Sequence, residues 1–66
     1  MKITINGRLK EFSSAENLKT VIGQFSGGHT HVIAEVNGTV VKRPSWEQTA
    51  MREGDAIELV NLVGGG

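Results

Sequence analysis

The sequence predicts an α+β fold in which one helix packs on one mixed five-stranded sheet. Five short stretches alternate between apolar and polar residues, as strands with one buried face do, and a single stretch has helical periodicity. Two Asn-Gly dipeptides, typical of tight hairpin turns, separate neighbouring strands. The expected order is strand, strand, helix, strand, strand, strand. The 66 residues suffice for one thin core and leave no room for an enclosed catalytic pocket.

The chain begins with a predicted β-hairpin. Ile3 and Ile5 alternate with polar residues, and the turn at Asn6-Gly7 leads into a return strand that ends at Phe12. Leu9 and Phe12 fall on opposite faces of that strand unless a bulge intervenes. The sequence leaves this point open.

A helix is predicted after the hairpin. Ser13 and Glu16 have the spacing of a capping box, so the helix is expected to begin there. Gly23 is either tolerated within the helix or caps its end. The apolar positions fall on one stripe that should cover the sheet: Leu18, Val21, Ile22 and Phe25.

The third predicted strand is residues 31–37, followed by the second Asn-Gly turn and a short strand that Pro44 ends. Residues 45–51 are expected to contain one helical turn, with Ser45 as a possible cap. Trp46 should anchor the small core, its indole N–H bonded to a backbone carbonyl. Arg43, three residues earlier, is expected to stack on Trp46 or to form a salt bridge.

The last strand is predicted over residues 56–63. If Ile57 and Leu59 face the helix, then Val60 and Leu62 point to the opposite face, together with Ile33 of the third strand. An apolar face that no helix covers indicates a contact surface for a partner. The predicted partner-binding residues are Ile33, Val60, Leu62 and Val63.

The chain ends in three glycines, Gly64, Gly65 and Gly66. We expect residues 1–63 to form the domain and residues 64–66 a flexible tail. Three extended residues span roughly 10 Å, so the Gly66 carboxylate can enter a partner's active site while the domain stays outside. The alternative is an inert, frayed end.

Composition argues against several functions. Seven basic and seven acidic residues with no run of either sign give no indication of a nucleic-acid or membrane partner. No cysteine is present, and the two histidines, His29 and His31, lack companion ligands, so no metal site is expected. The glycines do not fit a phosphate-binding loop, so no nucleotide should bind to the chain itself. Without a signal peptide or an apolar span, a cytoplasmic location is expected.

Taken together, these features resemble the ubiquitin-like β-grasp sulfur carriers, and among them the thiamine-biosynthesis carriers. The resemblance covers the whole chain and includes the Arg-x-x-Trp spacing of Arg43 and Trp46. Its other features are Ile5-Asn6-Gly7, Val36-Asn37-Gly38, Glu53-Gly54-Asp55, and Ile57-Glu58-Leu59-Val60 leading through Val63 to the glycines.

The resemblance implies that the chain is a protein co-substrate and not an enzyme. A ubiquitin-activating-type adenylyltransferase would use ATP and magnesium to adenylate the Gly66 carboxylate. A cysteine desulfurase relay would supply the sulfur that replaces the adenylate, and thiazole synthase would receive it from the resulting thiocarboxylate. The sequence agrees, because a chain without cysteine cannot carry sulfur as a persulfide.

Three alternatives remain open from sequence. A small subunit of molybdopterin synthase would use the same chemistry for another cofactor. A ubiquitin-like modifier would attach its terminus to a lysine of a target protein. A plain β-grasp interaction domain would have an inert tail.

Overall fold

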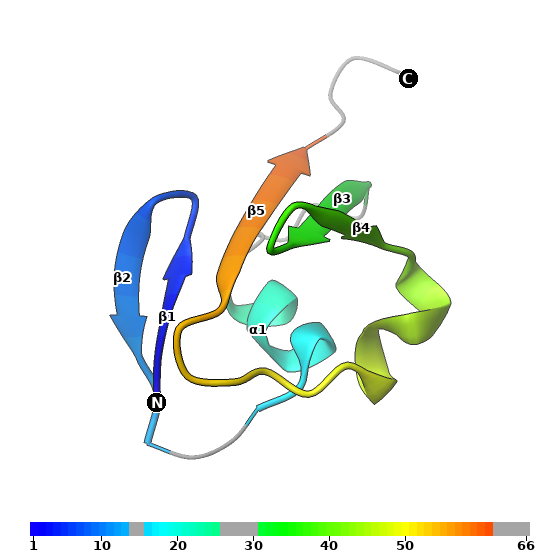
Figure 1. The fold of residues 1–66 in the computed structure, drawn as a ribbon. Coiled ribbons are helices and arrows are strands. Elements are labelled where there is room, and N and C mark those ends of the chain that lie inside the picture. Colours follow the sequence, from blue (N-terminus) through cyan, green and yellow to red (C-terminus); the bar gives the residue numbers. More distant parts are fainter. Residues whose placement is uncertain (14–15, 26–30, 62–66) are drawn as a thin grey trace.

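One helix lies across one face of a five-stranded sheet, as the sequence predicts (Figure 1). The computed structural model describes residues 1–13, 16–25 and 31–61. The elements in chain order are β1 (Lys2–Ile5), β2 (Arg8–Glu11), α1 (Leu18–Phe25), β3 (Val32–Val36), β4 (Thr39–Val41), the 3-10 helix η1 (Arg43–Gln48) and β5 (Ala56–Asn61).

The last strand, β5, occupies the middle of the sheet, whose order is β2-β1-β5-β3-β4. It pairs parallel with β1 and antiparallel with β3, while the two outer pairs are antiparallel hairpins. Both Asn-Gly turns are confirmed: Asn6 and Asn37 have φ values of 51° and 52°, and the following glycines also have positive φ. Such turns match the right-handed twist of the strands that they join.

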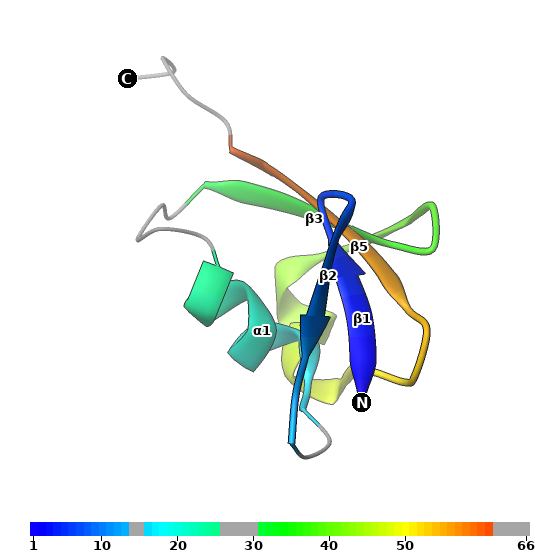
Figure 2. The ribbon, with the colours of Figure 1, turned by 90° about the vertical axis from the view of Figure 1, so that its left-hand side faces the viewer.

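The core lies between α1 and the sheet (Figure 2). The buried helix residues Leu18, Val21 and Ile22 belong to the predicted stripe, whereas Phe25 at the end of α1 is 37% exposed. Ile3 and Ile57, from the two parallel strands, are among the most completely buried side chains. The other core members are Ile5, Phe12, Ala34, Trp46 and Met51.

The predicted start of the helix is wrong. α1 begins at Leu18, and the side chain of Asn17 caps it by accepting a hydrogen bond from the Thr20 N–H at 2.8 Å. The Leu18 N–H is bonded to the Thr49 carbonyl at 2.8 Å, so a contact distant in sequence also fixes this end. Ser13 therefore lies too early to cap α1. Gly23 lies inside the helix.

The helical turn predicted over residues 45–51 is instead a 3-10 helix that begins at Arg43. Pro44 lies in its first turn, where a missing N–H costs nothing. Ser45 therefore lies within this helix and is not its cap. The two predictions for Trp46 are confirmed: its indole N–H donates to the Val41 carbonyl at 2.7 Å, and the Arg43 guanidinium lies over its ring at 5.3 Å.

The parity of β2 is regular and needs no bulge. Leu9 is paired with Thr4 on the face away from α1 and is 64% exposed. Lys10 faces the helix side, with its ammonium 5.6 Å from the centre of the Phe25 ring. Phe12, one residue beyond β2, packs edge-on against the same ring at 6.0 Å. Lys10 of β2, Phe12 just after it and Phe25 of α1 thus contact one another at this edge of the core.

The helices within the described residues are all too short or too polar to cross a membrane. The predicted domain boundary at residue 63 and the glycine tail, residues 64–66, lie outside the described part of the chain.

Candidate functional site

The face of the sheet opposite α1 carries exposed apolar side chains. Ile33 and Val60 are direct cross-strand partners of β3 and β5, and they are 37% and 50% exposed. This confirms the parity predicted for both residues. Val40 of β4 adds a third apolar side chain to this face, because it pairs with Glu35 and is 54% exposed. Val40 was not among the partner-binding residues predicted from the sequence.

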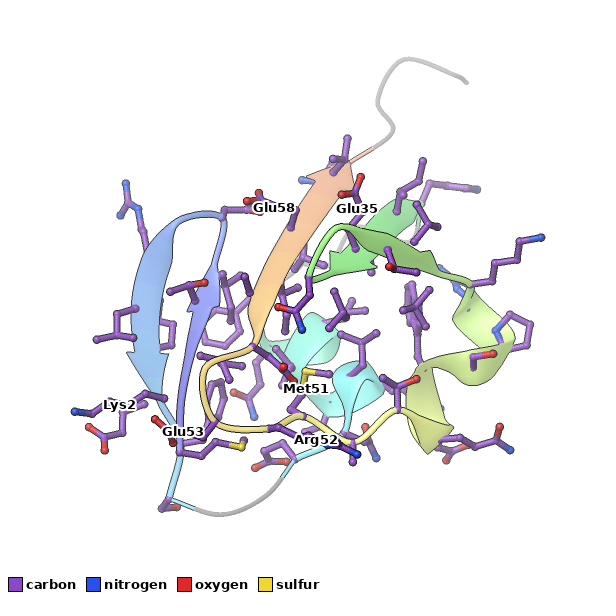
Figure 3. The ribbon with its side chains drawn as sticks, in the orientation of Figure 1. Lys2, Glu35, Met51, Arg52, Glu53 and Glu58 are labelled. Carbon is purple, nitrogen blue, oxygen red and sulfur yellow. The ribbon has the colours of Figure 1, made fainter. Side chains whose placement is uncertain are left out.

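Two carboxylates lie among these apolar residues. Glu35 and Glu58 are paired directly across β3 and β5, two residues along the strands from Ile33 and Val60 (Figure 3). We call the five residues Ile33, Glu35, Val40, Glu58 and Val60 the outer patch. Alternation alone places both glutamates on this face, but their pairing depends on a register between non-consecutive strands that the sequence does not reveal.

The strand that carries Glu58 and Val60 of the outer patch also leads to the C-terminus. β5 is described as far as Asn61. The other predicted site residues, Leu62, Val63 and the glycines Gly64, Gly65 and Gly66, lie outside the described residues.

The two turn asparagines fasten β5 at two points. Asn37 Oδ1 accepts a hydrogen bond from the Ala56 N–H at 3.0 Å, and its Nδ2 donates to Asp55 Oδ1 at 3.0 Å. Asn6 Oδ1 accepts from the Leu59 N–H at 2.7 Å. Because β1 is paired with β5 only as far as Ile57, the Asn6 side chain extends this side of the ladder by one more bond. Sequence reasoning identified both residues as turn formers and missed this second role.

The acidic residues near the last turn have structural partners. Glu53 Oε1 accepts from the Lys2 N–H at 2.9 Å, joining the turn to the start of β1 (Figure 3). Asp55 Oδ2 accepts from the Arg52 N–H at 2.8 Å within the turn itself. Both carboxylates therefore have a structural role at this turn. Among the described residues no group of three or more potential ligands could hold a metal ion.

Comparisons with known proteins agree on one family. The model of the ThiS family matches residues 3–66. A crystal structure of a thiamine biosynthesis protein (ThiS) from Geobacter metallireducens superposes with a TM-score of 0.84, at 28% identity and with both chains fully covered. An NMR solution structure of a thiamine biosynthesis protein from the same organism gives a TM-score of 0.78 at 28% identity, covering all of this chain and 88% of the other.

Two curated relatives differ in how much of them the chain covers. A thiazole synthase of Paramagnetospirillum magneticum is 33% identical over all 66 residues, but this chain spans only 20% of that protein. The uncharacterized protein ycf40 of Trieres chinensis is 29% identical over 62 residues, which cover 94% of this chain and 85% of the relative. The matched region of the thiazole synthase is thus a minor part of a larger protein.

Proposed function

This chain belongs to the ThiS family, and from that membership we propose that it is a sulfur carrier of thiamine biosynthesis. One observation supports this proposal above all: the family match extends over residues 3–66 and so includes the three terminal glycines. The similarity to solved thiamine biosynthesis proteins over the full chain supports the same pathway.

The proposed chemistry takes place at the Gly66 carboxylate. An oxygen of this carboxylate attacks the α-phosphorus of ATP, which gives an acyl-adenylate and releases pyrophosphate. A cysteine persulfide of the relay then attacks the acyl carbon and expels AMP, which gives an acyl disulfide. A thiol cleaves the S–S bond of this disulfide and is itself oxidised to a disulfide, so that a thiocarboxylate remains in which sulfur replaces one oxygen of the terminus. The partner enzyme supplies ATP and magnesium. The chain contributes a terminus without side chains, which leaves the acyl carbon open to attack.

The proposed role is that of a carrier acted on by other proteins. The receiving partner is thiazole synthase, since a protein of that name contains a segment similar to the whole of this chain. A ubiquitin-activating-type adenylyltransferase and a cysteine desulfurase relay complete the set of partners. We assign docking to the exposed apolar residues Ile33 and Val60, and to Leu62 and Val63 further along the chain.

Intact-mass spectrometry tests the proposal. The purified chain is incubated with an activating enzyme, ATP, magnesium and a sulfur source. The expected product is heavier by the difference between one sulfur and one oxygen atom. A variant that lacks Gly65 and Gly66 is the control: it should keep the circular dichroism spectrum of the full chain and gain no mass. An unchanged full chain, or a sulfur-loaded truncated variant, would contradict the proposal.

A further inference from the structure

The two glutamates of the outer patch carry like charges at directly opposed positions, which lowers the stability of the sheet. Glu35 and Glu58 are directly opposed on antiparallel strands, where Cβ atoms lie about 4.5–5.5 Å apart and like charges destabilise the sheet. Among the described residues, no ion pair or side-chain hydrogen bond relieves either carboxylate. Glu35 is also half-buried, whereas Glu58 is exposed.

The surroundings of the pair determine what can cover it. Val40 lies beside Glu35 on β4, and the Ile33–Val60 pair lies two residues away from the glutamates along β3 and β5. A partner that buries these three apolar side chains must also remove water from both carboxylates. Two desolvated carboxylates without a cation are strongly unfavourable. A wholly apolar partner surface is therefore a poor fit for the outer patch.

We propose that thiazole synthase binds the outer patch with an apolar surface that places one basic side chain between Glu35 and Glu58. This inference rests on the proposed sulfur-carrier function and specifies the chemistry of its receiving partner. The apolar members of the patch supply the contact area, and the carboxylate pair sets register and selects the partner by charge complementarity. Arginine fits best, because its planar guanidinium can bond to two carboxylates at once.

The position of Glu58 connects this contact to sulfur delivery. Glu58 and Val60 lie on β5, and the chain continues from this strand to the glycines. A partner bound to the outer patch thus contacts β5, the strand that the C-terminal residues follow. The charge pair is expected to weaken the free domain and to strengthen the complex.

Removing one charge of the pair should therefore stabilise the free chain and weaken its binding to thiazole synthase, and both effects can be measured. Glu58→Gln keeps the shape of the side chain and removes one charge, and Glu47→Gln is a matched control on the exposed surface of η1. Binding to purified thiazole synthase is measured by isothermal titration calorimetry at low and high salt. Urea denaturation of each free chain gives its stability, and intact mass after incubation with the activating enzyme reports loading at Gly66.

We expect Glu58→Gln to weaken binding about tenfold at low salt and to reduce its salt dependence. The same substitution should raise the urea midpoint of the free chain, while Glu47→Gln changes neither quantity. If Glu58→Gln binds as tightly as the wild type, or has a lower midpoint, the inference is wrong while the carrier function stands. A wild-type chain that acquires sulfur at Gly66 but does not bind thiazole synthase also overturns the inference. A wild-type chain that never acquires sulfur overturns the proposed function instead.

Discussion

Asn6→Gly tests how the strand that leads to the glycine terminus is held. Asn6 has a φ of 51° and accepts the Leu59 N–H at 2.7 Å. Glycine adopts positive φ more readily than asparagine does, so the substitution keeps the turn and removes the acceptor. The Leu59 N–H is directed away from β3, and after the substitution only water can accept it.

The size of the effect follows from the number of bonds lost. One net intramolecular hydrogen bond contributes about 1 kcal/mol to stability. Because 1.4 kcal/mol corresponds to a tenfold change, the Leu59 amide should exchange with deuterium about fivefold faster. A loss of about 1 kcal/mol also lowers the melting temperature of a domain of this size by about 4–8 °C.

Asn37→Gly is the matched control for this measurement. Asn37 occupies the equivalent turn with a φ of 52°, but it accepts the N–H of Ala56, at the other end of β5. Hydrogen–deuterium exchange followed by NMR should therefore separate the two variants. Asn6→Gly should accelerate Leu59 more than Ala56, and Asn37→Gly should do the reverse. Equal acceleration of both amides in both variants would refute the role assigned to the two side chains.

Three further predictions concern substitutions at four positions. Gly23→Ala should stabilise the chain by about 1 kcal/mol, since Gly23 lies inside α1 and an added methyl group would meet only open space. Gly54→Ala should destabilise the chain by about 1–2 kcal/mol, because Gly54 has a φ of +86°. Urea denaturation that gives stability changes of the same sign for both variants would contradict this. Trp46→Phe should lower the free energy of unfolding by about 1–3 kcal/mol in the same assay. Trp46 is only 6% exposed, and the substitution removes the indole N–H that donates to the Val41 carbonyl. An unchanged urea midpoint would show that this hydrogen bond is not needed for stability. Val60→Thr keeps the β-branched shape of an exposed strand residue, so we expect a stability change within about 0.5 kcal/mol and several-fold weaker binding to thiazole synthase; unaltered affinity would remove Val60 from the docking surface.

Local patterns were sufficient to predict most of the fold. The Asn-Gly turns depend on two adjacent residues, and alternation correctly placed Ile57 in the core and Val60 on the outer face. The start of α1 was mispredicted because Ser13 and Asn17 are both good capping residues. The bond from the Leu18 N–H to the Thr49 carbonyl and the bridge between Asn17 and Ala50 help to fix the start near Asn17. No local pattern contains those contacts.

The candidate site was predictable to the extent that it depends on strand parity. Parity placed Ile33 and Val60 on the uncovered face before their pairing was known. It could not show that Glu35 opposes Glu58, because β3 and β5 are separated in sequence by β4 and a 3-10 helix whose lengths do not fix the register of the two strands. The resemblance to the thiamine-biosynthesis carriers, noted from short motifs, is confirmed by the family match.

The transfer of labelled sulfur to thiazole synthase tests the central claim most directly. The chain is loaded at Gly66 with isotopically labelled sulfur, separated from the activating enzyme and the sulfur source, and mixed with thiazole synthase and its remaining substrates. Mass spectrometry then follows the label. The proposed function predicts labelled sulfur in the thiazole ring, in an amount equal to that lost from the chain. Label that stays on the chain, while unlabelled thiazole forms, would contradict it.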